Sequence, residues 1–293
     1  MEKIHKETIE LIKAALAEDV GCGDLTSLAC LTPDPLKAKV IAKSDGVLSG
    51  LRPFCLVFHI VDSANTIRPF KQDGDRFSKG ETILEIDGFN QTLLASERVA
   101  LNFLAHLSGI ATMTSQFVEK VAGTNCRILD TRKTTPGFRY LEKQAVLHGG
   151  GTNHRMGLYD MILVKDNHID SAGSIKDAVE MAREYLKTPE FRLQFDCKAE
   201  DILIEVEVTS IAQLEEAISA GADRLLLDNQ STDSLKEMVT LSKRIAPTVM
   251  LEASGNVSLA TVADIAATGV DFISVGAITH SAPVCDFSMR VTN

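Results

Sequence analysis

From Arg127 onward, the sequence alternates short apolar runs with amphipathic stretches that are long enough for helices. Six runs are candidate strands, at 127–130, 161–165, 202–208, 224–228, 248–254 and 271–276. Helices are predicted between them over 174–186, 211–220, 231–245 and 258–268, and several of these ranges open on a serine that can cap the first turn. Repeated βα units with apolar strands predict a parallel sheet covered by helices, built either as a barrel or as an open doubly wound sheet.

Polar side chains lie at the end of almost every candidate strand, and they favour the barrel. They are Asp130 with Arg132 and Lys133, Lys165 with Asp166, Glu205 and Glu207, Asp228 with Asn229, Glu252 with Ser254, and Ser274. Functional groups from so many strand ends converge on one point only if the strands form a ring. We therefore expect an α/β protein with an incomplete, TIM-like barrel of fewer than eight full units.

The first 110 residues have a different pattern. Short strand candidates at 38–43, 65–70 and 81–86, with glycine-containing turns between them, predict a small α/β domain with antiparallel strands. A long helix over 90–121, with a break near Ser108 and Gly109, leads into the barrel. We expect one domain over 1–110 and the barrel over 111–279, with residues 280–293 returning to the first domain.

Overall charge and cysteine spacing limit the class of protein. A net charge of −10 argues against a nucleic-acid or anionic-membrane partner, because both are polyanions that repel such a surface. Six cysteines lack any paired spacing typical of zinc sites or disulfide frameworks. Residues 1–21 carry charge throughout and predict an amphipathic helix, with neither a signal peptide nor a membrane span. These features predict a cytoplasmic protein with reduced thiols.

A basic segment stands out against this acidic background. Residues 127–165 hold seven Lys or Arg against three Asp or Glu, a local charge of +4. A solvated basic face is the simplest explanation of such a run. However, Arg132 and Lys133 directly follow one strand, Lys165 ends the next, and three glycines at 149–151 precede His154 and Arg155. Guanidinium and ammonium groups gathered at a barrel mouth bind carboxylates or phosphates, so we expect an anion site.

The sequence of this segment, DTRKTTPGFRYLEKQAVLHGGGTNHRMGLYDMILVKDNHI, resembles the quinolinate phosphoribosyltransferase family almost residue for residue. Further matches follow in the family's order at 17–27, 96–114, 204–208, 225–229, 251–257 and 271–283. The resemblance implies an N-terminal α/β sandwich domain, an incomplete α/β barrel, and a homodimer whose active sites are completed by the partner. The stretch 188–201 departs from the family by its length.

The resemblance also implies roles for individual residues. Quinolinate carboxylates would meet Arg132, Lys133, His154 and Arg155, with Arg98 supplied by the other subunit. Lys133 and Lys165 would meet phosphate oxygens, and Glu205 and Asp228 would serve the ribose hydroxyls and Mg²⁺. The main-chain cradle for the 5′-phosphate would be formed by two turns, Ser254-Gly255-Asn256 and Ser274-Val275-Gly276. Backbone N–H groups at glycine turns do favour anions.

The implied reaction joins quinolinate to phosphoribosyl pyrophosphate and yields nicotinate mononucleotide, pyrophosphate and CO₂, in de novo NAD biosynthesis. Lys133, Lys165, Glu205 and Asp228 are the implied catalytic residues. Mg²⁺ and cations would stabilise the departing pyrophosphate, and a carboxylate the oxocarbenium-like ribose. The pyridine nitrogen becomes cationic on attack, which makes loss of the adjacent carboxylate feasible, so no separate organic cofactor is needed.

Several alternatives stay open at this stage. Lys165 could be a Schiff-base lysine of a lyase or aldolase. The chain could be a non-catalytic protein that binds a phosphorylated pyridine, or a molybdenum-transport paralogue of the family. Glu205 and Glu207 alternate along one strand and share a face, where either could form a structural salt bridge. Roles for His106, His168 and His280 are undecided by the sequence.

Overall fold

The computed structural model describes residues 5–292. Contacts divide the chain into two compact units. One unit holds the chain up to Ser115, Thr134–Gly151 and the chain from Ala277, and the other holds Gln116–Lys133 and Thr152–Gly276. The domains predicted over 1–110 and 111–279 differ from this division mainly at 134–151. That segment joins the first unit because its helix is bonded there, with Glu142 paired to His106.

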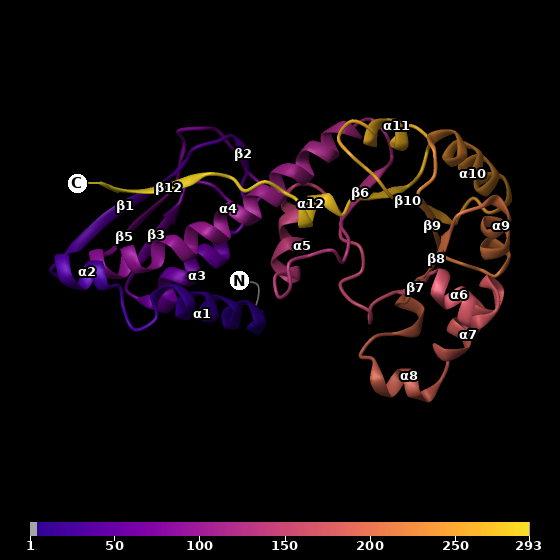
Figure 1. Ribbon diagram of the computed structural model, residues 1–293, viewed down its shortest axis with the longest axis horizontal. Coiled ribbons are helices and arrows are strands. Elements are labelled where there is room, and N and C mark those ends of the chain that lie inside the picture. The colour runs from indigo at the N-terminus through magenta and orange to yellow at the C-terminus, as the bar shows by residue number, and fades with distance from the viewer. Residues whose placement is uncertain (1–4, 293) are drawn as a thin grey trace. The chain divides into compact units, whose positions relative to one another are not determined.

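The first unit is built on a four-stranded antiparallel sheet in the order β12-β1-β5-β3. Its strands are β1 (Pro35–Ala42), β3 (Thr66–Pro69), β5 (Thr82–Phe89) and β12 (Phe287–Thr292), and a small pair joins β2 (Gly46–Val47) to β4 (Arg76–Phe77). In β1, Ala38, Val40 and Ala42 are buried while the residues between them are more exposed, which is the period-two pattern of a sheet with one core face. Helices α1 (Lys6–Val20) and α3 (Leu51–Val61) lie on one side of this sheet (Figure 1).

The final strand, β12, pairs antiparallel with β1, with Val40 opposite Met289. The last residues therefore contribute a strand to the N-terminal sheet. The helix predicted over 1–21 is α1, and residues 1–4 of that range lie outside the described residues. Two further helices of this unit are α2 (Leu25–Cys30) and α12 (Ala277–His280).

The long helix α4 (Asn90–Lys120) is continuous, so the predicted break near Ser108 and Gly109 was wrong. The hydroxyl of Ser108 does not bond to the backbone of its own helix. It donates to the carbonyl of Ser49, outside the helix, at 3.0 Å. Gly109 has a packing role, since a Cβ there would lie 2.2 Å from the carbonyl oxygen of Pro283. The two residues that suggested a break instead allow the neighbouring chain to approach the helix closely.

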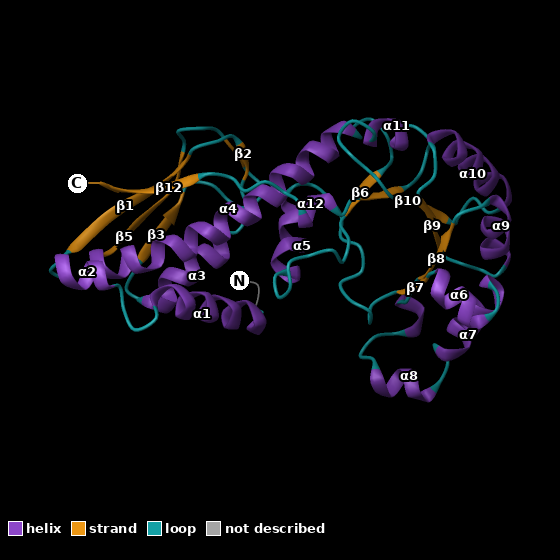
Figure 2. Cartoon of the chain, viewed as in Figure 1, coloured by secondary structure: helices purple, strands orange, loops and turns teal. Residues whose placement is uncertain are grey.

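The second unit contains six parallel strands in the order β6-β11-β10-β9-β8-β7. They are β6 (Arg127–Leu129), β7 (Ile162–Val164), β8 (Ile204–Val208), β9 (Arg224–Asp228), β10 (Met250–Ser254) and β11 (Phe272–Ser274). All six coincide with predicted runs, so the strand predictions are confirmed. The strands curve around a common centre with helices on the outside (Figure 2), and β6 does not pair with β7. The unit is therefore the predicted incomplete barrel.

The chain from Thr152 to Arg155 runs along the free edge of β6, in the place where a closed barrel would continue. Thr152 forms a parallel bridge with Leu129. Its N–H donates to the carbonyl of Ile128 at 2.8 Å, and its carbonyl accepts from the N–H of Asp130 at 3.2 Å. This short pairing fixes the start of the segment that carries His154 and Arg155.

The outer helices of this unit are α6 (Asp166–Ala172), α7 (Ile175–Tyr185), α8 (Pro189–Gln194), α9 (Ile211–Ser219), α10 (Thr232–Ile245) and α11 (Val262–Ala266). Ser174, Ser210 and Ser231 cap three of them through their hydroxyl oxygens, as expected from their positions. The helix predicted over 258–268 is shorter and covers only α11. The long stretch 188–201 forms α8 and a single 3₁₀ turn, Ala199–Asp201.

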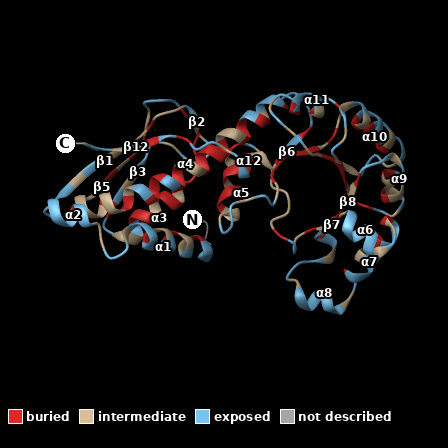
Figure 3. Cartoon of the chain, in the orientation of Figure 1, coloured by how far each residue is buried: buried red, intermediate tan, exposed pale blue. Residues whose placement is uncertain are grey.

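Burial follows this architecture. The strands of the second unit and much of α4 are buried, whereas α6 to α10 expose their outer sides (Figure 3). Among the described residues, no helix combines the length and the apolar character that crossing a lipid bilayer would require.

The glycine run after α5 (Arg139–His148) gives a test of packing. A Cβ on Gly149 would lie 2.4 Å from the carbonyl oxygen of Ala111 in α4, and main-chain atoms of a helix cannot easily retreat. We expect Gly149→Ala to lower the free energy of unfolding by about 2 kcal/mol, as overpacking does. Gly123→Ala is the control, because a Cβ at Gly123 would have no atom within 4 Å. It should lower the free energy of unfolding by only about 1 kcal/mol, the cost of an alanine at a φ of +89°. Urea denaturation of both variants is the measurement, and equal losses would contradict the packing argument.

Candidate active site

A pocket opens at the carboxyl ends of the strands of the second unit, with about 1030 Å³ of open space. Every strand, or the residues that follow it, contributes to the wall. The lining residues are Thr131, Arg132, Lys133, His154, Arg155, Leu163, Lys165, Glu207, Leu226, Asp228, Glu252, Ser254 and Ser274. Pairs two positions apart on one strand, such as Glu252 and Ser254, face the same way because side chains alternate along a strand. The convergence predicted from the strand ends is therefore present.

Cations dominate the part of the wall that follows β6 and β7. Arg132, Lys133, Arg155 and Lys165 all face this pocket. Nη1 of Arg155 donates to the carbonyl of Met161 at 3.1 Å, which steadies the guanidinium without neutralising it. Burial and then the positive charge of Arg132 lower the pKa of Arg155, while Glu205 and Asp160 oppose this effect. Two like-charged guanidinium groups that line one pocket favour the binding of an anion there.

Lys165, after β7, pairs with Glu207 on the neighbouring strand β8. Its Nζ lies 2.6 Å from Oε2 of Glu207, and the lysine side chain is 45% exposed while the glutamate is 16% exposed. A Schiff-base lysine uses an apolar surrounding, and Lys165 instead has an acid as its immediate partner. The geometry therefore gives no support to the lyase or aldolase hypothesis.

The two acids on β8 lie at different depths, which the sequence did not reveal. Glu207 lines the pocket, whereas Glu205 is fully buried and is absent from the lining. Both residues share a face, but Glu205 lies one pleat deeper, opposite Arg224 of β9. Among the described acids, Glu207 and Asp228 line the pocket together with Glu252, whose side chain is fully buried. Of the two acids on β8, only Glu207 is placed to line the pocket, whereas the site role was predicted for Glu205.

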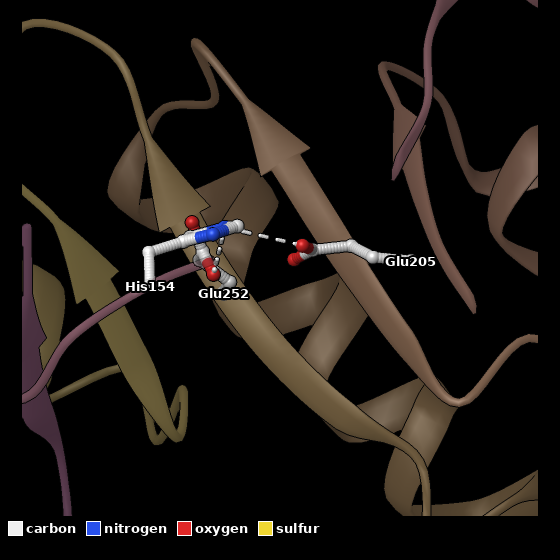
Figure 4. A group of neighbouring side chains, drawn as sticks. All are labelled: His154, Glu205 and Glu252. Atoms are coloured by element: carbon white, nitrogen blue, oxygen red, sulfur yellow. Dashed lines mark ion pairs between the residues drawn. The ribbon is translucent and has the colours of Figure 1, made fainter. Parts of the chain in front are cut away.

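A buried polar cluster forms the floor beneath this pocket. Nε2 of His154 lies 3.2 Å from Oε2 of Glu205 and 3.5 Å from Oε2 of Glu252, as Figure 4 shows. Nη1 of Arg224 lies 3.4 Å from Oε2 of Glu252, and its guanidinium covers the ring of Phe272 with 4.5 Å to the ring centroid. Both glutamates have 0% exposure. Within residues 5–292, both oxygens of Glu205 and Oε1 of Glu252 lack a hydrogen-bond partner.

Burial in this cluster raises the pKa of both acids. For Glu205 the main cause is desolvation, which Arg224 partly offsets. For Glu252, desolvation and then the charge of Glu205 raise the pKa to about 7, against the opposing effects of His154, Ser274 and Arg224. Two adjacent buried carboxyls cannot both ionise easily, so the pair holds a proton near neutral pH.

The predicted phosphate cradle is present only in part. Ser254 and Ser274 line the pocket, and Gly255 after Ser254 has a φ of +96°. A Cβ on Gly255 would lie 2.1 Å from Oδ1 of Asn229, so this turn requires glycine. The N–H of Val275 donates to the carbonyl of Leu129 at 2.9 Å, so in this structure that amide takes part in the pairing with β6.

Other predicted residues lie outside the pocket wall. Arg98 is exposed on α4 in the first unit. Gly255, Asn256 and Gly276 continue the two turns beyond the lining serines, and Asn256 has a φ of +50°.

The three undecided histidines have local partners. His106 pairs with the buried Glu142 at 2.8 Å in the first unit. Nδ1 of His168 lies 3.0 Å from the N–H of Lys165 at the start of α6. Nδ1 of His280 lies 2.6 Å from the hydroxyl of Ser281.

Glu252 and Arg224 are residues of the site region to which the sequence reasoning gave no role. Glu252 was recognised as a polar group near a strand end, but its neighbour Ser254 received the assignment. The usable signal was the period of two, since a residue two positions before a pocket residue on a strand points to the same side.

Comparison with known proteins agrees with this geometry. The family model for the quinolinate phosphoribosyl transferase C-terminal domain matches residues 110–290, and the N-terminal domain model matches 24–108. The chain belongs to the quinolinate phosphoribosyltransferase family. The resemblance inferred from the basic segment is thereby confirmed, and so is the fold class.

Individual relatives cover nearly the whole chain. A Bacillus subtilis protein, named a probable carboxylating nicotinate-nucleotide pyrophosphorylase, is 41% identical and covers 98% of this chain and 94% of its own. The structure of the nicotinate-nucleotide pyrophosphorylase from Francisella tularensis superposes with a TM-score of 0.90 at 37% identity, covering 99% and 98%. The Streptococcus pyogenes protein NadC gives 0.90 at 41% identity, covering 100% and 99%. Members of the quinolinate phosphoribosyltransferase family from distant bacteria therefore share both units.

The raised pKa of Glu252 predicts a pH effect on stability. The folded state binds this proton more tightly than the unfolded state, so stability is fully present below the ordinary value of 4.5 and falls as pH rises through about 7. Over that window the free energy of unfolding should drop by about 3 kcal/mol from this group. We expect Glu252→Gln to flatten this dependence between pH 5 and 7.5.

Urea denaturation across this pH range measures the effect. Glu237→Gln, at an exposed position on α10, is the control and should keep the wild-type profile. His154, Glu205 and Arg224 face Glu252 and stay in place in both variants. An unchanged slope in Glu252→Gln would show that Glu252 is ionised throughout.

Proposed function

We propose that the pocket at the carboxyl ends of the strands is the active site at which quinolinate and phosphoribosyl pyrophosphate become nicotinate mononucleotide, pyrophosphate and CO₂. The chain belongs to the family of carboxylating nicotinate-nucleotide pyrophosphorylases, which act in de novo NAD biosynthesis. The observation that carries the assignment is the gathering of Arg132, Lys133, Arg155 and Lys165 around one pocket, with Glu207 and Asp228 at its rim. Both substrates are polyanions, so a cation-lined pocket in an acidic protein matches them.

Arg132 and Arg155 suit the quinolinate carboxylates. Quinolinate carries two carboxylates on adjacent carbons of a pyridine ring, and each carboxylate can accept a bidentate pair of hydrogen bonds from one guanidinium. Arg132 and Arg155 line the same pocket, and after burial the positive charge of Arg132 is the main cause that lowers the pKa of Arg155. A dicarboxylate bound between them would relieve this repulsion and orient the ring.

Lys133 and Lys165 suit phosphate oxygens, because an ammonium acts as a compact point charge. Ser254 and Ser274 add hydroxyl groups to the wall from β10 and β11. The glycine turn after Ser254 lets the main chain approach closely, which supports a place for the 5′-phosphate there. Lys165 would exchange its bond to Glu207 for a substrate phosphate as binding proceeds.

The residues present fit Mg²⁺, although not through the pair first predicted. Mg²⁺ prefers carboxylate and phosphate oxygens, and it keeps several waters when few protein ligands reach it. Glu207 and Asp228 offer such oxygens from the pocket wall, whereas Glu205 is sealed below it. We assign Glu207 and Asp228 as the residues that would hold Mg²⁺ together with pyrophosphate oxygens. When bound, the ion would neutralise part of the charge that develops on the leaving pyrophosphate.

The remaining chemistry needs orientation and charge. The C1–O bond of the ribose breaks and its electron pair leaves with pyrophosphate, whose charge Lys133 and Lys165 stabilise. The carboxylates of Glu207 and Asp228 face the side where the oxocarbenium-like ribose forms. The pyridine nitrogen donates its electron pair to C1 and becomes cationic. The C2–carboxylate bond then breaks, CO₂ leaves, and the electron pair at C2 takes a proton.

We further propose a homodimer in the cytoplasm, with Arg98 of each subunit completing the partner's site. Support comes from the exposure of Arg98 on α4 and from its absence from the pocket wall of its own chain. All six cysteines are free thiols, which suits a reducing compartment. The Arabidopsis thaliana relative, 40% identical, is named as chloroplastic, so compartments differ among relatives.

The decisive assay is CO₂ release from carboxyl-labelled quinolinate in the presence of phosphoribosyl pyrophosphate and Mg²⁺. We expect Arg155→Lys to raise KM for quinolinate at least about tenfold, because a bidentate charged hydrogen bond is lost. KM for phosphoribosyl pyrophosphate should change less than about twofold. Arg244→Lys, at an exposed position on α10, is the matched control.

Each outcome of this assay is informative. If the wild-type protein binds both substrates but releases no CO₂, the chain is a non-catalytic binding protein and not an enzyme. If Arg155→Lys raises KM for both substrates equally, Arg155 contacts the phosphates of phosphoribosyl pyrophosphate and not only the quinolinate carboxylates.

The shared active site predicts complementation between subunits. Arg98→Ala and Lys165→Ala should each be nearly inactive alone. In a symmetric dimer, an equal mixture forms half hybrids, and one of the two sites in each hybrid carries neither change, so about one quarter of wild-type activity should return. Mass spectrometry confirms subunit exchange in the mixture. Hybrids without recovered activity, or full activity of Arg98→Ala alone, would refute the shared site.

A further inference from the structure

His154 lines the pocket, but protein groups occupy both nitrogens of its ring. The main-chain N–H of Arg155 donates to Nδ1 at 2.7 Å, so Nδ1 carries no proton. The ring proton of the neutral imidazole is then on Nε2. That nitrogen points at the buried acids, 3.2 Å from Glu205 and 3.5 Å from Glu252 (Figure 4). Neither nitrogen is therefore directed toward a substrate in the pocket above.

The main chain on either side of this ring is fixed as well. The N–H of His154 donates to Oδ1 of Asp130 at 2.9 Å, and Asp130 is fully buried at the end of β6. The next residue, Arg155, receives its orientation from two bonds: its N–H to the His154 ring and its Nη1 to the carbonyl of Met161. A continuous series of contacts thus leads from the floor of the barrel to the guanidinium in the pocket.

We propose that Glu252 is a positioning residue whose Oε2 holds the Nε2–H of His154, with Glu205 as a second buried carboxyl beside the ring, so that Nδ1 fixes the Arg155 main chain and aims the Arg155 side chain at the quinolinate carboxylate. The inference rests on the proposed function and deepens it. It also removes His154 from direct contact with the carboxylates. His154 then links a buried acid pair to the arginine that binds substrate. The arrangement is similar to metal sites, where residues that hydrogen-bond to the metal ligands orient them.

A metal ion is the competing explanation of the same cluster. The ligand atoms of His154, Glu205 and Glu252 lie within 4.8 Å of one another, which an ion could bridge. Two observations favour the hydrogen-bonded arrangement. First, Arg224 already supplies a positive charge 3.4 Å from Glu252. Second, Nδ1 of His154 accepts a hydrogen bond from the Arg155 N–H, so the ring proton is on Nε2. A bound ion would require that proton to leave.

The first test reads the tautomer of His154 in the wild-type protein and needs no turnover. Protein labelled with ¹⁵N-histidine gives ring-nitrogen resonances by NMR, and the His154 signal is assigned by its loss in His154→Asn. We expect protonated Nε2 and unprotonated Nδ1, unchanged when quinolinate is added. A protonated Nδ1, or a ring signal that changes protonation with quinolinate, would overturn the proposal. So would loss of the Nε2 proton on adding Mn²⁺ or Zn²⁺, which would favour the metal site.

The second test separates action through His154 from direct contact with substrate. Glu252→Leu removes the acceptor and should raise KM for quinolinate at least about tenfold, with KM for phosphoribosyl pyrophosphate within about twofold. Glu252→Gln keeps an acceptor oxygen and should retain most quinolinate affinity. In the His154→Asn background, whose amide oxygen can still accept from the Arg155 N–H, Glu252→Leu should have no further effect.

The outcomes distinguish this inference from the proposed function. An effect of Glu252→Leu that persists undiminished in His154→Asn would assign Glu252 to direct substrate contact and overturn the positioning role. Equal rises in both KM values would show a general loss of structure and also count against it. If wild-type protein fails to turn over quinolinate, the proposed function fails, whereas the tautomer measurement still decides the arrangement of His154.

Discussion

The short parallel pairing of Thr152 with the free edge of β6 is the constraint on which the site depends. Six strands do not close a barrel, and β6 would otherwise expose an unpaired edge toward β7. Two main-chain hydrogen bonds of Thr152 cover part of that edge. Because the pairing is parallel and in register, the next residues lie beside the end of β6, where Asp130 holds the N–H of His154. The gap in the incomplete barrel, beside β6, is thus the place where His154 and Arg155 enter the pocket wall.

Charge is arranged in layers along the axis of this unit. Cations line the pocket at the carboxyl ends of the strands, and the acids Glu207 and Asp228 lie among them. Below are two fully buried glutamates with His154 and Arg224. Isolated buried carboxylates would be costly, but here each has a cationic or polar neighbour, and burial favours a shared proton. The lower layer stabilises the geometry of the upper one at a cost in stability, which is common where a site must be rigid.

Sequence alone predicted the strands, the barrel and most of the pocket wall, because apolar runs and strand-end polar residues follow simple periodic rules. It did not predict how deeply each side chain is buried below the pocket. Glu205 and Glu207 obey the same period of two, and only the register with β9, which sets Glu205 opposite Arg224, shows that Glu205 is the buried one. Nor could the sequence show that the N–H of Val275 donates to the carbonyl of Leu129. The break expected in α4 failed because Gly109 serves close packing and not a turn.

His154 shows why a residue in a pocket wall need not bind the substrate. Its ring carbons contribute surface, but hydrogen-bond capacity decides chemistry, and an imidazole has only two nitrogens to offer. Once Arg155 and the acid pair have taken both, the ring can transmit orientation but cannot recognise a carboxylate. The task of recognition then falls on the guanidinium groups, each of which carries five N–H donors. Specificity for a dicarboxylate would therefore follow from the rigidity of Arg155, and that rigidity from two buried acids beside the His154 ring.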